Sequence, residues 1–484
     1  MNYKMMGRFN ALILALEAAF MLPAFLISIF LSETASAYSF LITMGILLAV
    51  SALLAILSKN ATRDFYAREG LICVGSSWIL LSLFGCLPFV FSGVIPNFVD
   101  ALFETVSGFT TTGSSILTDL DLVPRGIMYW RCFSNWLGGM GVLVFLLAVV
   151  PVGGQNEGFT MHLLRAESPG PDVGKMMPRM RQTTAALYLT YIGLSLLNLI
   201  FLLAGKMSFF DALCTTFSTA GTGGFGVYND SMAGFSPYIQ WVCITFLLLY
   251  GINFSCYYLI LLRRFRAILG DEELKLYLGL VLGSVALIVW NLRGFYETLG
   301  ETVRHSFFQV ASIITTAGFA TTDFDLWPSF SKAILVILMI FGACAGSTGG
   351  GLKCARALLL FKSMCRNISL VLRPQKVKVI RVNGKPVDEK ILSGTGAYFF
   401  VYMLIAFVSF LILSFDGFSF ETNLTAAISC LNNIGPGLGM VGPTGNYASF
   451  SVLSKLVLIF DMLAGRLEIF PILVLFIPHA WKRG

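Results

Sequence analysis

The 484-residue chain has few charged residues, only three histidines and no CxxC cysteine pair. Charged residues make up 12% of it, about half the share of a typical soluble domain, and hydrophobic residues make up 56%. An ordinary soluble fold is therefore excluded. The ten cysteines are scattered, so neither a cysteine metal cluster nor a disulfide scaffold is expected. The chain also lacks GxSxG and HExxH motifs, which argues against an enzyme.

Ten apolar segments are each long enough to cross a bilayer. The first is too long for the apolar core of a cleaved signal peptide and is expected to be retained. The sequence therefore predicts an all-α polytopic membrane protein with ten full spans. The segments are residues 11–32, 39–58, 71–93, 127–151, 183–205, 236–262, 275–294, 331–360, 395–415 and 450–478.

Basic residues lie in alternate connections between these segments. The formal net charge of +7 comes mainly from these connections, so it does not indicate nucleic-acid binding. Loops rich in Lys and Arg remain on the cytoplasmic side of a membrane. With ten spans, both termini are predicted to be cytoplasmic.

Four stretches rich in Thr, Asn and Gly interrupt the apolar pattern. They read FTTTGSS (109–115), TAGTGGFG (219–226), ITTAGFATT (314–322) and LNNIGPGLG (431–439). A mildly apolar segment of about ten residues, too short to span a bilayer, precedes each stretch. In every case 13 positions separate the first residue of that segment from a glycine, which indicates an internal repeat. The short segments are residues 100–109, 211–220, 305–314 and 422–431.

The repeat divides the chain into five parts. Each repeat comprises a span, a short half-helix, a Thr/Gly loop and a second span, so four half-helices are expected. Two additional N-terminal spans precede the repeats. The predicted parts are 1–70 for the additional spans and 71–182, 183–274, 275–392 and 393–484 for the four repeats.

The four Thr/Gly loops are predicted to form a cation selectivity filter with quasi-fourfold symmetry. Non-helical backbone at membrane depth must be buried in protein or line water, and rings of carbonyl oxygens can replace the hydration shell of an ion. Glycine permits the required dihedral angles, and helix C-termini favour cations. The candidate residues are Thr111, Thr112, Gly113, Thr222, Gly223, Gly224, Thr316, Ala317, Gly318, Asn433, Ile434 and Gly435.

Two questions about these loops stay open from the sequence. The second loop can be aligned on Gly223 or Gly224, although the 13-residue spacing favours Gly224. Ordinary outer loops, or sites where small residues let helices pack closely, are the alternative to a filter.

The segment 341–353 (FGACAGSTGGGLK) has five glycines within ten residues, too many for a stable straight helix. It is predicted to be a gating loop in which Gly346, Gly349, Gly350 and Gly351 move. A kinked, closely packed helix is the alternative. Lys353 is either an anchor for the loop or an interfacial lysine.

Arg466 lies deep in the last apolar segment and is predicted to form part of the gate. Asp461 and Glu468 are its candidate partners, but Glu468 is only two positions away and lies on a different helical face. A static Arg–carboxylate pair is the alternative. Arg131 is interpreted mainly as an interfacial anchor, with a role in bracing the filter from behind as the alternative, and Asn135 as an interhelical hydrogen-bonding residue.

The stretch RPQKVKVIRVNGKPVDEKIL (373–392) alternates basic and apolar residues around Asn383-Gly384, which predicts a β-hairpin. Ten basic residues lie between 353 and 390. They could bind a regulatory soluble partner or anionic lipid head groups, and an ordinary positive-inside loop without a docking role is the alternative. The candidate docking residues are Lys376, Lys378 and Arg381.

The motifs FTTTGSS, TGGFG, TTAGFAT and NNIGPG together resemble the Trk/Ktr/HKT superfamily of potassium transporters, in particular the TrkH-type membrane subunit of bacteria. The resemblance implies transport of K⁺ across the bacterial inner membrane and a homodimer with two separate pores. It also implies a TrkA-like cytosolic ring that binds nucleotide, and it implies no organic cofactor. Glycine at all four aligned positions is the family pattern associated with K⁺ preference. The family has an intramembrane gating loop at residues 342–353 and an arginine in the pore at Arg466.

A coupled Na⁺/K⁺ or H⁺/K⁺ symporter is the competing function. Secondary transporters often have inverted repeats and midplane carboxylates. Here the repeats run in the same orientation and carboxylates within the spans are sparse. The sequence favours a gated pore and leaves coupling open.

Overall fold

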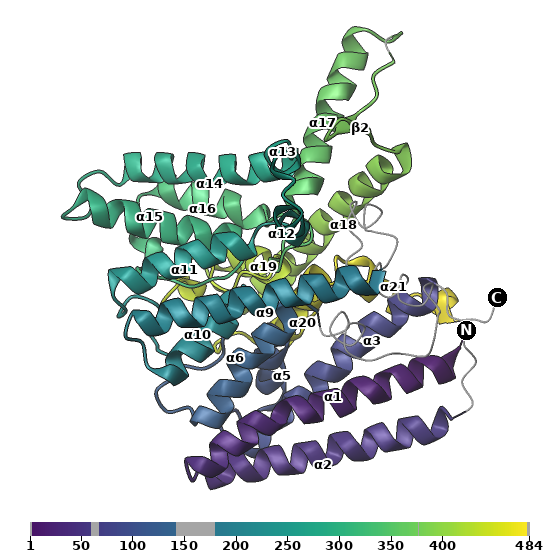
Figure 1. The fold of residues 1–484 in the computed structure, drawn as a ribbon, viewed down its shortest axis with the longest axis vertical. Coiled ribbons are helices and arrows are strands. Elements are labelled where there is room, and N and C mark those ends of the chain that lie inside the picture. The colour runs from purple at the N-terminus through teal and green to yellow at the C-terminus, as the bar shows by residue number, and fades with distance from the viewer. Residues whose placement is uncertain (1, 60–66, 142–179, 376, 482–484) are drawn as a thin grey trace.

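The computed structural model describes residues 2–59, 67–141, 180–375 and 377–481. The described part is mostly helical, with one two-stranded sheet. Helices α1 (Tyr3–Phe30) and α2 (Thr34–Leu57) pack side by side at one edge of the molecule (Figure 1). They contact α3 and α6 of the first repeat, and thus form a separate pair beside it.

The first two repeats contain the same sequence of elements. The short helices α5 and α10 follow a long outer helix, and an inner helix follows each of them. In the second repeat the inner helix is bent by 91° between α11 and α12. The elements are α3 (Ala67–Gly85), α4 (Leu87–Phe91), α5 (Phe98–Phe109), α6 (Arg125–Gly139), α9 (Met180–Ala204), α10 (Phe209–Ala220), α11 (Pro237–Tyr250), α12 (Phe254–Leu261) and α13 (Phe265–Leu269).

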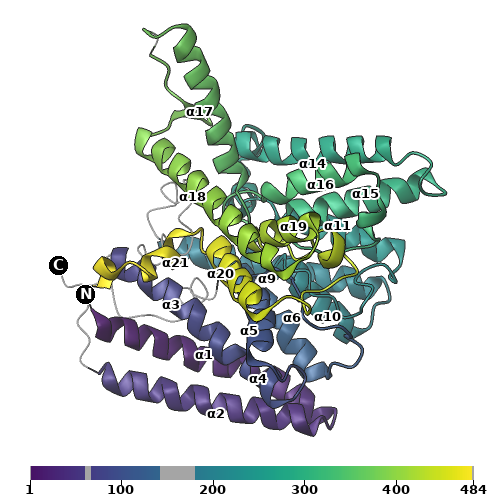
Figure 2. The same cartoon turned by 180° about the vertical axis from the view of Figure 1, so that it is seen from behind.

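The third and fourth repeats follow the same order, with interrupted inner helices (Figure 2). Helix α17 extends beyond the rest of the molecule in both views. The elements are α14 (Glu272–Asn291), α15 (Leu299–Ile314), η2 (Phe324–Leu326), α16 (Ser329–Ile340), α17 (Cys354–Leu372), α18 (Glu389–Leu413), η3 (Ser414–Asp416), α19 (Phe420–Leu431), η4 (Gly439–Val441), α20 (Val452–Arg466), α21 (Phe470–Leu475) and η5 (Pro478–Trp481).

The four predicted half-helices are confirmed as α5, α10, α15 and α19. Each ends at the predicted last residue, namely Phe109, Ala220, Ile314 and Leu431. Helix α15 begins six residues before the predicted start, at Leu299, because Thr298 caps it by accepting a hydrogen bond from the Glu301 amide.

Six helices in the described residues are long and apolar enough to cross a membrane, or seven if α11 and α12 form one span. Non-helical residues interrupt three predicted spans: 236–262 between α11 and α12, 331–360 between α16 and α17, and 450–478 between α20 and α21. The interruption of 331–360 is the predicted 341–353 loop, whereas the other two interruptions are not predicted. The predicted span 127–151 is described only as far as Gly141. The total of ten spans stays a prediction.

The predicted hairpin is confirmed. Strands β1 (Arg381–Val382) and β2 (Lys385–Pro386) pair antiparallel. Asn383 and Gly384 have φ angles of 51° and 76°, as a two-residue turn matching the strand twist requires. Lys376, one of the three predicted docking residues, lies outside the described residues.

Candidate functional site

The four short helices begin and end in the same way. Their N-termini are capped by side chains of Asn97, Ser208, Thr298 and Ser419. Beyond each C-terminus, the second residue has a positive φ of 52–60°: Thr111, Thr222, Thr316 and Asn433. Positive φ is unfavourable for β-branched residues and marks a conformation imposed by the surrounding structure.

The glycine two positions further on also has a positive φ in every loop. The values are 81° at Gly113, 66° at Gly224, 80° at Gly318 and 100° at Gly435. Gly224 rather than Gly223 is therefore the structural counterpart of the other three. We call these four residues the glycine ring.

A hydrogen bond to a serine stabilises each loop, and the sequence analysis missed this feature. The amide of the residue before each ring glycine donates to a serine carbonyl five positions earlier, over 2.8–3.0 Å. Serine stands six positions before every ring glycine, but the bond uses its main-chain carbonyl, which any residue could supply. The serines are Ser107, Ser218, Ser312 and Ser429.

The four loops lie against one another in a closed order. A β-carbon added to any ring glycine would meet the carbonyl oxygen of the residue that precedes the next ring glycine. Only glycine fits such an approach. The pairs are Gly113 with Gly223, Gly224 with Ala317, Gly318 with Ile434, and Gly435 with Thr112. The candidate residues of the four distant sequence stretches are therefore brought together.

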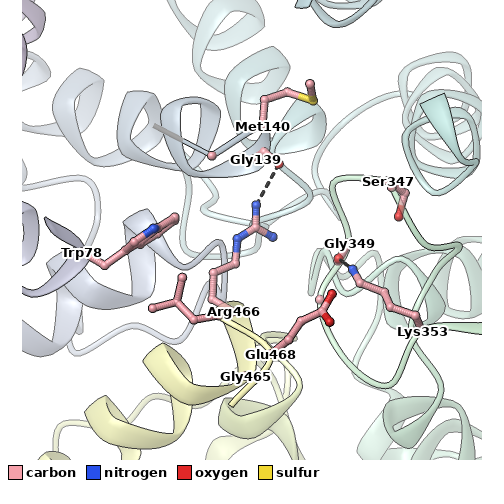
Figure 3. A pocket seen from close by; sticks show the side chains of 13 residues that line it. Trp78, Gly139, Met140, Ser347, Gly349, Lys353, Gly465, Arg466 and Glu468 are labelled. Atoms are coloured by element: carbon pink, nitrogen blue, oxygen red, sulfur yellow. Dashed lines mark hydrogen bonds between the residues drawn. The ribbon is translucent and has the colours of Figure 1, made fainter. Parts of the chain in front are cut away.

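A cavity of about 150 Å³ opens on one side of these loops and is lined by all four ring glycines together with Arg131. A second cavity of about 90 Å³ lies toward the interruptions of the inner helices (Figure 3). Its lining includes Gly349, Gly350, Lys353 and Arg466.

Residues 341–353 form a loop rather than the alternative kinked helix. Its ends are tied together where the Gly342 amide donates to the Leu352 carbonyl over 2.8 Å. At its centre, the Gly350 amide donates to the Thr316 hydroxyl over 2.7 Å. A β-carbon on Gly350 would lie 2.7 Å from the Asn432 carbonyl oxygen. The loop thus lies directly against the third and fourth Thr/Gly loops.

Arg466 connects this loop to the first repeat. Its guanidinium donates to the carbonyl of Gly139 over 2.7 Å (Figure 3). It also donates to the carbonyls of Thr348, over 2.8 Å, and of Gly138. Arg466 thus links the end of α6 with the 341–353 loop.

The two candidate partners of Arg466 have other contacts. Asp461 accepts a hydrogen bond from Ser409 over 2.8 Å. Glu468 forms a buried ion pair with Arg356 of α17, whose guanidinium lies 3.9 Å from the centre of the Tyr398 ring. Lys353 donates to the carbonyl of Gly349 within the loop, as expected of an anchor.

Glu273, in the first turn of α14, is a second site that the sequence analysis missed. Its carboxylate accepts hydrogen bonds from the amides of Ala345 over 2.6 Å and Ala355 over 3.0 Å. It thus holds the 341–353 loop and the start of α17 together. No local sequence signal marks a carboxylate whose partners lie more than 70 residues away.

The interpretation of Arg131 as an interfacial anchor is wrong. Its side chain is 2% exposed and pairs with Glu104 at 2.6 Å. Because the two charges compensate each other, the pair can be buried inside the protein. The interpretation of Asn135 is confirmed, since its amide donates to Ser218 of α10 over 3.4 Å.

The hairpin β1–β2 is attached to the start of α14. The Asn383 side chain accepts from the Glu272 amide over 2.9 Å and donates to Asp271 over 3.0 Å. Lys378 and Arg381 are exposed nearby. The described residues contain no group of three or more His, Cys, Asp or Glu side chains placed to hold a metal ion.

These features define a class: helical membrane proteins in which four repeats of one chain converge on a single ring of glycine loops. The sequence pattern of the TrkH family, described as a cation transport protein, matches residues 36–288 and 297–483. The chain therefore belongs to the TrkH family.

Individual relatives match this chain over its full length. The Trk system potassium uptake proteins TrkH of Salmonella typhimurium and Escherichia coli are 36% and 35% identical to it, with 100% of both chains covered. The crystal structure of the potassium transporter TrkH from Vibrio parahaemolyticus superimposes with a TM-score of 0.89 at 31% identity and covers 100% of both chains.

Proposed function

We propose that the chain conducts K⁺ across the bacterial inner membrane through a selectivity filter formed by the four Thr/Gly loops. The observation that carries this proposal is the closed order of the ring glycines and their neighbouring carbonyls. Main-chain oxygens in such a ring can replace the water around a cation. The C-termini of four short helices add partial negative charge. The names of the relatives specify potassium uptake, and K⁺ is therefore the proposed ion.

The 341–353 loop acts as the gate below this filter. Its contacts with Thr316 and Asn432 place it against two of the four loops. Arg466 and Lys353 hold it there through main-chain carbonyls. Opening requires these contacts to break, and the fixed charge of Arg466 opposes a cation near the closed loop.

A homodimer controlled by a TrkA-like cytosolic ring that binds nucleotide completes the proposal. The hairpin is the docking surface, with Lys378 and Arg381 as exposed contact residues. A route from this surface to the gate runs through Asn383, the start of α14, and Glu273.

Isotope uptake into vesicles that contain only the purified chain tests the function. We expect uptake of Rb⁺, used as a K⁺ analogue, to exceed uptake of Na⁺ by at least about tenfold. Uptake should follow the Rb⁺ gradient alone. Equal uptake of both ions contradicts the filter.

Coupling to H⁺ or Na⁺ is the second candidate mechanism, and Glu17 of α1 favours it. This residue is 1% exposed, and neither of its carboxyl oxygens has a hydrogen-bond partner among the described residues. It lies beside Gly85, close to Thr105 and Phe109 of α5. A buried carboxyl group can carry a proton. Rb⁺ uptake driven by an imposed proton gradient in the wild type, but not in Glu17→Gln, would favour the symporter.

A further inference from the structure

A buried ion pair lies behind the first and second Thr/Gly loops. Glu104 of α5 and Arg131 of α6 are 0% and 2% exposed, and their charged groups meet at 2.6 Å. The carboxylate of Glu104 also accepts from the Ser115 hydroxyl over 3.0 Å and the Ile116 amide over 2.8 Å. Glu104 therefore holds the segment that directly follows Gly113.

Arg131 extends these contacts to the second loop. Its guanidinium donates to the Gly226 carbonyl over 3.0 Å and to the Ser115 hydroxyl over 3.2 Å. The same group lies 3.7 Å from the centre of the Phe225 ring. Ser115 and Gly226 stand two positions after ring glycines Gly113 and Gly224. One guanidinium thus binds equivalent positions of two neighbouring quarters.

The other junctions of the ring are held differently. The positions equivalent to Glu104 are Thr215, Gln309 and Ala426, counted nine residues before each ring glycine. At the junction of the fourth and first loops, the Tyr447 hydroxyl donates to the Gly435 carbonyl over 2.7 Å. The Tyr447 amide donates to the Ser115 carbonyl over 2.9 Å. Ser115 is therefore held by the Glu104–Arg131 ion pair and by the Tyr447 amide. Only the attachment to the ion pair depends on charge.

We propose that Glu104 and Arg131 are positioning residues for ion selection, which set the separation of the first and second quarters of the filter. This inference rests on the proposed function. A planar guanidinium with several donors holds fixed distances better than a single ammonium group. Removing one member leaves a buried charge without its counter-charge, so the two loops move.

The pair also controls the charge at the entrance to the ring. Arg131 lines the 150 Å³ cavity beside all four ring glycines. An uncompensated guanidinium there would repel an approaching cation. Glu104 neutralises it, so the arginine can brace the loops without excluding the transported ion.

The test is the Rb⁺/Na⁺ uptake ratio of single variants in vesicles. In Glu104→Gln, which keeps the shape of the side chain, we expect the ratio to fall about tenfold and the apparent KM for Rb⁺ to rise. In Arg131→Lys, which keeps the charge but loses the planar group, we expect a smaller fall in the ratio with little change in KM.

Lys332→Gln is the matched control. Lys332 pairs with Asp325 at 3.3 Å and Glu421 at 3.4 Å, and is partly exposed. Because exposed ion pairs contribute little, the uptake ratio should be unchanged in this variant.

A merely structural role predicts a different result, namely equal losses of Rb⁺ and Na⁺ uptake with an unchanged ratio in both variants. That result overturns the inference. If Glu104→Gln does not fold, Arg131→Lys and Glu104→Asp decide the question through the same ratio. An unchanged ratio in these variants, beside an altered ratio in Gly113→Ser, rejects the positioning role and leaves the filter intact. An unchanged ratio in Gly113→Ser as well rejects the filter itself.

Discussion

At the scale of single residues, the candidate filter depends on backbone conformation more than on side-chain chemistry. Three threonines and one asparagine adopt positive φ at equivalent positions, followed by a glycine two residues later. Each such non-glycine residue costs of the order of 1–3 kcal/mol, and only a well-packed environment maintains it. The ring therefore requires a rigid support around it.

Gly113→Ser should weaken discrimination between K⁺ and Na⁺. A β-carbon at Gly113 would collide with the Gly223 carbonyl oxygen and displace one quarter of the ring. We expect the Rb⁺/Na⁺ uptake ratio to fall about tenfold, which corresponds to about 1.4 kcal/mol. Gly417→Ser is the control, because Gly417 has a φ of 74° but no neighbour within 4 Å of an added β-carbon. Equal ratios in the two variants would refute the filter assignment.

Arg466→Ala should raise the basal flux. The substitution removes the contacts with Thr348 and Gly139 and also removes a fixed positive charge from the pathway. We expect an increase of about tenfold in Rb⁺ uptake without any partner protein. A folded variant with unchanged uptake would instead favour a purely structural arginine.

The sequence predicted the residues of the glycine ring but not those that support it. The glycines and threonines recur at a constant offset, so four weak signals reinforce one another. Glu104 and Glu273 occur once each, and they bind backbone groups 12 and 72 residues further along the chain. A charged residue in an apolar segment shows that a partner exists, but it does not show which one. Arg131 was misinterpreted for this reason.

At the scale of secondary-structure elements, the inner helices of the second, third and fourth repeats are interrupted. Gly138 of α6 packs against the Phe109 carbonyl, and Gly465 of α20 packs against the equivalent Leu431 carbonyl. In the third repeat the interruption is the 341–353 loop. The short helices could be predicted accurately because their ends carry polar and glycine signals. The 341–353 interruption could also be predicted, from its five glycines, but those between α11 and α12 and between α20 and α21 could not, since hydropathy averages over a window and does not register where a helix must end.

Glu273→Ala should destabilise the closed position of the 341–353 loop. It removes the acceptor for the amides of Ala345 and Ala355, and hydrogen bonds to charged groups contribute about 1.5–3 kcal/mol each. We expect basal Rb⁺ uptake to rise about tenfold. The neighbouring Glu272→Ala variant is the control, because Glu272 pairs with Lys362 outside the loop. Uptake that is equally raised in both variants would assign the effect to α14 as a whole.

At the scale of the whole molecule, the proposed docking surface and the proposed filter lie at different ends of the third repeat. The hairpin lies at the start of α14 and next to α17, and α17 directly follows the 341–353 loop. The Thr/Gly loop of the same repeat contacts that loop where the Gly350 amide donates to the Thr316 hydroxyl. In the proposed function, a partner that moves the hairpin would therefore act on the 341–353 loop without touching the glycine ring.

Lys378→Glu combined with Arg381→Glu should abolish control by the cytosolic ring but leave basal flux intact. Both residues are exposed on the hairpin, and reversed charge repels an acidic docking surface. The measurement is Rb⁺ uptake with and without the purified ring and nucleotide. Lys59→Glu, an exposed basic residue far from the hairpin in the sequence, should retain control. Retained control in the double variant would remove the hairpin from the docking surface.

The order of the elements and the fourfold repeat could be predicted from the sequence because the 13-residue spacing fixed them. The closed contacts of the ring could not, because they join residues from different repeats.

Anomalous scattering from crystals of the chain grown in Rb⁺ tests the central claim most directly. The account predicts a Rb⁺ peak at the centre of the ring, surrounded by carbonyl oxygens of the four Thr/Gly loops, and its loss when Na⁺ replaces Rb⁺. A ring without a peak, or four loops that lie apart with no common centre, would contradict it.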